Sequence, residues 1–357
     1  SPLEPHLHGI TELAPYPRRH LVGSLAAIAA AGALPNVLAA QDASPASSPS
    51  ASPVASPAAD GEWTFTDDRG VTVTLPNRPQ RIVADLSAAA PLWDFGVRPL
   101  AVSGWTIATD AAWGNVDRST RIINASETTP DPDNEALVEL EPDLFVSITW
   151  NPEDPTTLWS FSDADSLITT ESIVPIVAIS ATGSAEANMN RFAELAALLG
   201  VDLNAPDLVA AKDAYDASVN AFSAISAQRS DLSVLFGYVG TDPEWYAAYT
   251  SDWADLAWYR TLGLNMIDVV AVAGDYWETL SFEQALLYPS DVIFLSTRSG
   301  TLSIEELQAH PTFGLHPAIA GNQVGAWNQD FIMSYQGLTS ALDNMTAILT
   351  TAEKLTS

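Results

Sequence analysis

Aromatic side chains recur just beyond several apolar, β-type runs of the sequence. In parallel α/β layers, ligands bind outside the carboxyl ends of the strands, so the residues that follow such runs are candidates for a binding site. Rings in these positions suit a flat, bulky ligand such as a metal chelate or a corrin, because they supply a large apolar area at low entropic cost. For any single ring, packing in the core is the alternative. The candidates are Trp105, Trp150, Trp245, Tyr246, Tyr276, Trp277 and Tyr335.

Arg298 is the candidate polar group of this site. It follows the apolar run at 291–297, and residues 61–357 contain only 12 Lys and Arg against 40 Asp and Glu. A planar guanidinium can hold a carboxylate, hydroxamate or catecholate oxygen at two points. An ordinary surface pair with a neighbouring acid explains the residue equally well. The scarcity of cations argues against a highly anionic ligand and favours a neutral or weakly charged chelate or a cobalamin.

The residues give little support to metal binding or catalysis. The chain has no cysteine, and residues 61–357 contain only His310 and His316, too few nitrogen or sulfur ligands for a bare transition metal. Residues 131–142 begin like a calcium loop, but Ala136 stands where that loop needs Gly and Pro142 where it needs Glu. Nucleophile-elbow, dinucleotide, P-loop and zinc-protease motifs are missing. We predict no catalytic residue, no cofactor and no direct metal site; a glycoside hydrolase with two carboxylates is the enzyme alternative.

One short unit occurs twice, as NEALVELEPDLFVS at 134–147 and as FEQALLYPSDVIFLS at 282–296. In each copy a Glu, Glu135 or Glu283, opens a short helical pattern, and an Asp eight residues later precedes a β-type run. A Glu in the first turn of a helix is stabilised by the helix dipole whatever else it does. The repetition indicates two similar halves.

The order of the elements predicts two α/β lobes joined by one long helix, with a ligand cleft between them. Strands that alternate with helices favour parallel sheets, and 357 residues suffice for two domains. We expect an N-terminal lobe over 61–205, the interlobe helix over 206–230 and a C-terminal lobe over 231–357. Strands are expected at 81–86, 99–104, 144–149, 173–179, 233–240, 291–297 and 323–328, a hairpin at 63–75, and long helices at 206–228 and 337–355.

Residues 1–60 have the features of an export signal and a spacer. A twin arginine at 18–19 precedes fourteen apolar and small residues, fewer than the roughly 18 that a membrane-spanning helix needs. We expect a twin-arginine signal peptide over 1–40 and an extended Ala/Ser/Pro-rich linker over 41–60. The protein would then reach the periplasm or the outer face of the cytoplasmic membrane. An uncleaved tether and an Ala-rich helix of the fold are the alternatives.

The charge balance limits the partners. With 14 Lys and Arg against 44 Asp and Glu, the chain has a formal net charge of −30. Such a field repels phosphate backbones and anionic lipid headgroups, so we expect no nucleic-acid partner.

The hairpin, RPQRIVADLSAAAPLWDFGVRPLAVSG at 78–104, the two Glu-containing units, the long helix and HPAIAGNQVGAWN at 316–328 together resemble the solute-binding proteins of iron-siderophore and vitamin B12 ABC importers. The resemblance covers residues 63–355. It implies that a rigid helix joins the two lobes and that the ligand binds in the cleft between them. The lobes are then expected to close only a little on the ligand. It also implies that one acidic residue on each lobe pairs with permease arginines, which assigns this role to Glu135 and Glu283; helix-end electrostatics alone is the alternative.

From the resemblance we expect a monomeric, non-enzymatic receptor for an iron(III)-siderophore-type chelate, with ABC permease subunits as its partner. A cobalamin or haem receptor of the same family stays open. An alternative from another functional class also stays open, a surface adhesion or scaffold module without a small-molecule ligand.

Overall fold

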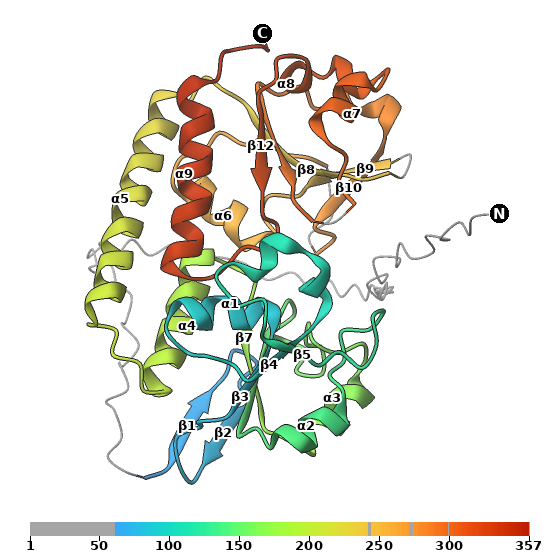
Figure 1. Cartoon of the computed structure of the whole chain (residues 1–357). Helices are drawn as coiled ribbons and strands as arrows, with labels where there is room; N and C mark the ends of the chain where they lie inside the picture. The colour runs from blue at the N-terminus through green and yellow to red at the C-terminus, as the bar shows by residue number, and fades with distance from the viewer. Residues whose placement is uncertain (1–60, 242–243, 271–273, 299, 357) are drawn as a thin grey trace, which may run out of the picture. The chain divides into compact units, whose positions relative to one another are not determined.

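The computed structural model describes residues 61–241, 244–270, 274–298 and 300–356, which fold into two α/β lobes (Figure 1). The expected signal peptide and linker at 1–60 lie outside the described residues. Among the described helices, none combines the length and the apolar character that crossing a membrane requires. The expected fold class of two α/β lobes is confirmed.

The N-terminal lobe begins with the expected hairpin. Trp63 and the other apolar residues of its first strand are buried while the threonines between them are exposed, the period of two that a half-buried strand requires. Trp63 Nε1 donates a hydrogen bond to the carbonyl of Leu198 at 3.1 Å, which fastens the hairpin to the lobe. The two strands are β1 (Trp63–Thr66) and β2 (Thr72–Leu75), and they pair antiparallel.

The N-terminal sheet is wholly parallel and has the strand order β5-β4-β3-β6-β7. Its two central strands are buried along their whole length, because helices cover both faces. The strands are β3 (Ile82–Asp85), β4 (Ala101–Ser103), β5 (Arg121–Ile122), β6 (Leu144–Thr149) and β7 (Ile176–Ser180). The helices are α1 (Leu86–Asp94), α2 (Asn134–Leu140), α3 (Ala164–Glu171) and α4 (Ala185–Leu198), with 3-10 turns η1 (Trp105–Ala108) and η2 (Asp110–Trp113).

Two long helices, α5 (Pro206–Gln228) and α9 (Tyr335–Thr351), lie side by side along one edge of the lobes (Figure 1). The range of α5 is the one that its apolar periodicity predicts. Ser218 Oγ donates to Asp343 Oδ1 at 2.6 Å, and Arg229 Nη1 donates to the carbonyl of Leu349 at 2.9 Å. The interlobe helix that the sequence predicts is α5, and α9 packs along it.

The C-terminal sheet has the order β10-β9-β8-β11-β12. Strands β8, β11 and β12 are parallel, but β9 runs antiparallel to both β8 and β10, so this sheet is mixed rather than wholly parallel. The strands are β8 (Val234–Val239), β9 (Glu244–Ala248), β10 (Trp277–Ser281), β11 (Val292–Ser296) and β12 (Val324–Trp327). The helices are α6 (Ala254–Thr261), α7 (Ile304–Ala309) and α8 (Pro317–Ala320), with 3-10 turns η3 (Phe282–Gln284) and η4 (Phe313–Leu315).

The repeated sequence unit occupies the same place in both lobes. It connects α2 to β6 in one lobe and η3 to β11 in the other, and each of these strands is fourth in the order of its sheet. Asp143 accepts hydrogen bonds from the backbone N–H groups of Gln80 and Arg81, just before β3. Asp291 likewise accepts from the backbone N–H of Ser233, just before β8. Each aspartate thus fixes the start of a central strand next to its own.

Candidate binding pocket between the lobes

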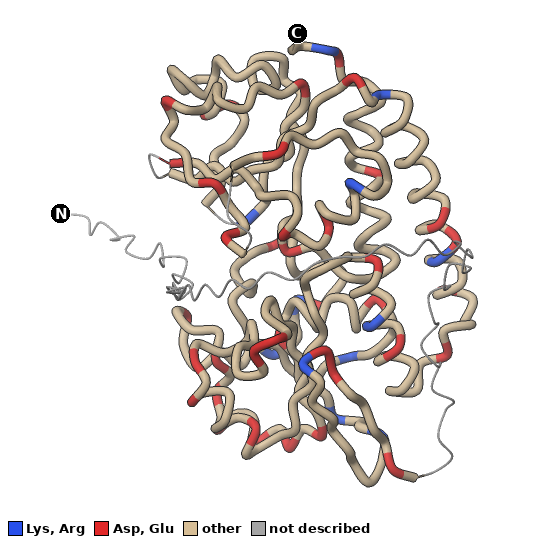
Figure 2. Tube along the Cα trace, turned by 180° about the vertical axis from the view of Figure 1, so that it is seen from behind, with Lys and Arg blue, Asp and Glu red and all other residues tan. Residues whose placement is uncertain are grey.

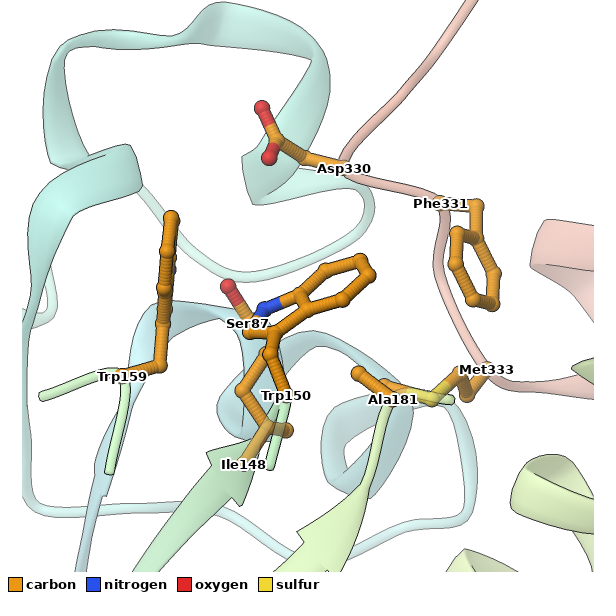
Figure 3. Close-up of a pocket in the computed structure, with 8 residues that line it drawn as sticks. All are labelled: Ser87, Ile148, Trp150, Trp159, Ala181, Asp330, Phe331 and Met333. Carbon is orange, nitrogen blue, oxygen red and sulfur yellow. The ribbon is translucent and has the colours of Figure 1, made fainter. Parts of the chain in front are cut away.

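A small pocket lies between the lobes, lined by both of them (Figure 3). Its volume is about 10 Å³, enough for roughly one water molecule. In this conformation it is therefore closed to any chelate. The N-terminal lobe contributes Ser87, Ile148, Trp150, Trp159 and Ala181, and the segment between β12 and α9 contributes Asp330, Phe331 and Met333.

The N-terminal wall of the pocket stands at the carboxyl ends of three neighbouring strands. Ser87 comes two residues after β3, Trp150 directly after β6 and Ala181 directly after β7. Such an edge of a parallel sheet is the usual place for a ligand. The sequence patterns that predicted these strands therefore also located this wall.

Asp85 fixes this wall from below. Its fully buried carboxylate caps α1 by accepting from the backbone N–H of Ala88 at 2.9 Å, and it also accepts from Ser147 Oγ at 2.8 Å and Ser160 Oγ at 2.9 Å. Burial raises the pKa of Asp85, although these hydrogen bonds act in the opposite direction. The bonds connect β3, β6 and the loop that follows β6, so the floor of the pocket is rigid.

Trp150 joins the two lobes across the pocket. Its ring centroid lies 6.0 Å from that of Trp159 in its own lobe, and 5.6 Å from those of Trp253 and Tyr276 in the other. In Figure 3 the indole lies between the rings of Trp159 and Phe331. Its Nε1 is buried and has no hydrogen-bond partner among the described residues. A buried donor without an acceptor is costly.

An aromatic cluster of the C-terminal lobe receives Trp150. Trp253 is its centre, with ring centroids 5.3 Å from Tyr276, 4.9 Å from Trp277 and 5.1 Å from Trp327. Tyr276 has a φ of 59°, in the left-handed region that is uncommon for residues other than glycine. Its carbonyl accepts from Trp253 Nε1 at 2.9 Å, which holds the two rings together. Backbone in a strained conformation is often found at binding sites.

Arg298 is bound by an acid that lines the pocket. Its Nε donates to Asp330 Oδ2 at 3.0 Å, and its Nη2 donates to the other carboxylate oxygen. The Asp330 side chain is 4% exposed and that of Arg298 is 22% exposed. The pairing that the sequence left as an alternative is therefore present, and it stands at the wall of the pocket.

The predicted site residues divide into two groups. Trp150, Tyr276 and Trp277 meet at the lobe boundary, Tyr246 touches Trp277 with a centroid separation of 6.3 Å, and Arg298 reaches the pocket through Asp330.

The other three candidates lie elsewhere. Trp245 is fully buried in the core of the C-terminal lobe, with its ring 5.3 Å from Phe313. Tyr335 packs against Phe95 at the start of α9, and Trp105 is an exposed residue of η1. None of the three lines the pocket between the lobes.

Sequence reasoning missed Trp159, Trp253, Trp327 and Asp330. Trp159 stands at the far end of the loop that begins with Trp150, so extending the search along that loop would have found it. Trp253 precedes α6, and Trp327 is the last residue of β12 and not the first residue after it. Only the packing of the two lobes brings these rings together.

Glu135 and Glu283 are exposed residues in the first turns of α2 and η3. Asp133 caps α2, and Ser281 forms a capping box with Gln284. Hydrogen bonds from its own backbone N–H and from Ser281 lower the pKa of Glu283. Within the described part of the chain, neither glutamate is in an ion pair, so both carboxylates are available to a partner.

Both histidines take part in the packing of the C-terminal lobe. The ring of His310 lies 4.5 Å from that of Phe282, and His316 is fully buried with its Nε2 3.0 Å from the carbonyl oxygen of Tyr288. Burial lowers the pKa of His316. Over the described ranges, no group of three or more His, Asp or Glu side chains is placed to hold a metal ion.

Comparison with known proteins gave one family and several similar structures. The family described as periplasmic binding protein matches residues 108–331. The structure of DesE, a ferric-siderophore receptor protein from Streptomyces coelicolor, is similar with a TM-score of 0.75 and 30% sequence identity, over 82% of this chain and 100% of that one. A comparison with curated protein sequences gave no match.

Two more distant structures share the fold. The siderophore periplasmic binding protein from the fuscachelin gene cluster of Thermobifida fusca has a TM-score of 0.55 and 21% identity, over 77% of this chain and 98% of that one. The catecholate-siderophore binding protein VctP from Vibrio cholerae has a TM-score of 0.54 and 16% identity, over 81% and 99% of the two chains.

Proposed function

Because the chain belongs to the periplasmic binding protein family, we propose that it is an extracytoplasmic receptor that binds a ferric siderophore and delivers it to an ABC permease. The observation that carries this proposal is the pocket, in which aromatic rings of both lobes meet at the carboxyl ends of parallel strands. The similarity to DesE, which is described as a ferric-siderophore receptor, supports the choice of ligand. The family consists of transport components, and the chain is not an enzyme.

The charges favour an uncharged or weakly charged chelate. Asp330 already neutralises Arg298, the cation that reaches the pocket wall. Acidic residues outnumber basic ones over both lobes (Figure 2). Among the described residues no Lys or Arg lines this pocket directly, so a highly anionic chelate would meet the field without a free cation to offset it. A ferric hydroxamate therefore suits the pocket better than a ferric catecholate.

We expect the side chain of Trp150 to move when the pocket opens for a ligand. Pockets for small molecules usually enclose about 300–1,000 Å³, far more than the space present here. The indole of Trp150 lies at the lobe boundary and is only half-buried, so its rotation would enlarge the pocket. The displaced ring then forms a wall for the chelate, with its Nε1 directed at a chelate oxygen.

A tryptophan-fluorescence titration of residues 61–357 tests the proposal. The panel contains ferric hydroxamate, catecholate and citrate chelates, haem and cobalamin, each corrected for its own absorbance. We expect saturable quenching by a ferric hydroxamate, and about tenfold weaker binding in Trp150→Ala, as for a residue at the centre of an interface. Trp105→Ala is the matched control, because Trp105 is exposed and does not line the pocket.

Other outcomes would redirect the proposal. Saturation by haem or cobalamin alone would keep the receptor and change its cargo. If no compound quenches the fluorescence or raises the melting temperature, the receptor proposal is wrong, because a bound ligand must stabilise the folded state. A surface adhesion or scaffold module would then be the better interpretation.

Delivery to the permease is assigned to Glu135 and Glu283. Each is an exposed carboxylate on a different lobe, at equivalent positions of the repeated unit. Two such charges on a rigid body fix its orientation on a partner that presents arginines. The proposed export signal at 1–40 takes the receptor to that partner as a monomer. Replacing Arg18 and Arg19 by Lys should leave the protein inside the cell, as a fractionation assay would show.

A further inference from the structure

Asp330 is the one ionisable side chain among the described residues that line the pocket between the lobes. It stands next to Phe331 on the segment that follows β12, as Figure 3 shows. The remaining lining residues are uncharged. The charge that a chelate meets at this wall therefore depends on Asp330 and on the cation that Asp330 binds.

That cation, the guanidinium of Arg298, is held entirely by its own lobe. Its Nε and Nη2 donate to the two carboxylate oxygens of Asp330, the two-point geometry that makes an arginine–carboxylate pair strong. Gln329 directs its amide oxygen at the guanidinium and accepts from Nη1 at 2.7 Å, while its amide nitrogen donates to Ser296 Oγ. Each guanidinium nitrogen thus already donates to a neighbour, and an anionic ligand could reach Arg298 only in competition with Asp330.

Other contacts already place both members of this ion pair. The backbone of Arg298 is fixed by its carbonyl, which accepts from Thr301 Oγ1 at 2.7 Å. Asn328 and Ser334, on either side of Asp330, donate hydrogen bonds to the N-terminal lobe. A buried ion pair is often no more stabilising than apolar side chains of similar volume, so stability alone does not account for this pair at a pocket wall.

A carboxylate in this position distinguishes chelates by their charge. A neutral chelate can lie against the paired side chains without an electrostatic cost. An anionic chelate must either lie against the carboxylate of Asp330 or break the ion pair to reach Arg298, and both cost free energy. A binding site gains specificity from such repulsion as well as from attraction to the preferred ligand.

We propose that Asp330 is a specificity-determining residue, which excludes anionic iron chelates from the pocket by its own charge and by keeping Arg298 within the lobe. This inference rests on the proposed function and adds to it the residue that selects the ligand. Arg298 is then a cation that the pocket conceals and not a contact of the chelate. Removing the carboxylate alone should therefore give the receptor an affinity for anionic chelates.

Fluorescence titration of the purified wild type and of Asp330→Asn tests this, with an uncharged ferric trihydroxamate and a strongly anionic ferric triscatecholate as probes. We expect Asp330→Asn to bind the triscatecholate about tenfold more tightly than the wild type does, because Arg298 becomes available. This gain should shrink in high salt, and the affinity for the trihydroxamate should stay about equal. Asp231→Asn is the matched control, because it removes a carboxylate 3.8 Å from Arg229 that does not line the pocket.

Arg298→Gln is the reciprocal variant, and it decides the question if the melting temperature shows that Asp330→Asn does not fold. It leaves the carboxylate of Asp330 without its cation. We expect its preference for a ferric trihydroxamate with a free ammonium group, over the uncharged one, to rise about tenfold relative to wild type.

The outcomes separate this inference from the proposed function. If the wild type binds the trihydroxamate but a folded Asp330→Asn gains no affinity for the triscatecholate, Asp330 is only a structural partner of Arg298 and the inference is wrong, while the receptor stands. A wild type that binds the triscatecholate as tightly as the trihydroxamate would also refute it. If no chelate of either charge binds to the wild type or to the variants, the proposed function and this inference fail together.

Discussion

The carboxyl group of Asp255 is fully buried beneath the aromatic cluster, at the start of α6. Its Oδ2 accepts from Trp327 Nε1 at 2.7 Å, and its Oδ1 has no hydrogen-bond partner among the described residues. Burial raises the pKa of Asp255 to about 7, against the opposing effect of the Trp327 hydrogen bond. Protonation of Asp255 thus removes the negative charge beneath the aromatic cluster that contacts Trp150.

This raised pKa predicts a pH-dependent stability. Between pH 3.8 and pH 7 the folded carboxyl keeps a proton that the unfolded chain has released, so the free energy of unfolding falls as the pH rises through this window. The loss is at most about 4 kcal/mol, at 1.36 kcal/mol for each pKa unit. In Asp255→Asn this loss of stability with rising pH should be missing, because the amide does not titrate. Urea unfolding of the wild type and of Asp255→Asn across this pH window measures the loss. If the free energies of unfolding of the two proteins change in parallel with pH, the raised pKa is wrong.

Single residues were the hardest part of the site to predict from sequence. Trp245 and Tyr246 are neighbours, but successive residues of β9 point to opposite faces, so one ring enters the core and the other approaches Trp277. From the sequence no strand is expected over 244–248, and without a strand there is no reason to expect this alternation. The partner of Arg298 lies 32 residues further along the chain, and no local pattern identifies it.

At the scale of elements, the repeated unit stabilises each sheet through its aspartate. The aspartates of the two copies differ in how many hydrogen bonds they accept. Asp291 has a fully buried side chain and accepts from Ser233, Lys354 and the backbone N–H groups of Leu355 and Thr356. Burial alone would raise the pKa of Asp291, but these hydrogen bonds hold it well below its usual value. Over the part of the chain that the structure describes, Asp143 accepts only from the backbone N–H groups of Gln80 and Arg81, just before β3.

Asp291→Asn should therefore destabilise the protein more than Asp143→Asn. Hydrogen bonds to a charged group contribute about 1.5–3 kcal/mol each, so we expect a loss of about 3 kcal/mol at neutral pH for Asp291→Asn. The contribution of a carboxylate with a lowered pKa is present above pH 3.8 and is lost as the pH falls below it, so the difference from wild type should shrink in acid. Chemical unfolding at neutral and acid pH checks this; equal losses in the two variants would contradict it.

The elements themselves were largely predictable. Buried parallel strands are continuous apolar runs, and α5 has a regular apolar face, so both kinds of element are determined by local pattern. The antiparallel strand β9 was not predicted, because its pairing depends on β10, some thirty residues later. The pairing of α5 with α9 likewise depends on contacts between distant residues.

At the scale of the whole molecule, two sets of contacts connect the lobes. One is the α5 and α9 pair; the other is the segment between β12 and α9, where Asn328 Nδ2 donates to the carbonyl of Ala111 at 3.3 Å and Ser334 Oγ donates to Asp94. Sliding one lobe on the other would break both sets. The opening that a chelate needs is therefore expected from side chains.

Small-angle scattering should show little compaction when the chelate binds. A compact chain with the length of residues 61–357 has a radius of gyration of roughly 19 Å. We expect saturation of this protein with the ferric hydroxamate to change it by less than about 1 Å. A panel compound that does not quench the fluorescence is the control. A decrease of several times that amount would mean that the lobes close as rigid bodies and that the paired helices bend.

The pairing of α5 with α9 also has a consequence for synthesis. Domains usually fold in the order in which the ribosome makes them, and α9 is the last described helix of the chain. Until it is made, the face of α5 around Tyr215 and Ser218 lacks the cover that Tyr335 and Asp343 provide. A chain that stops before α9 is therefore a substrate for chaperones and proteases, and the ability to hold cargo is acquired in a single late step.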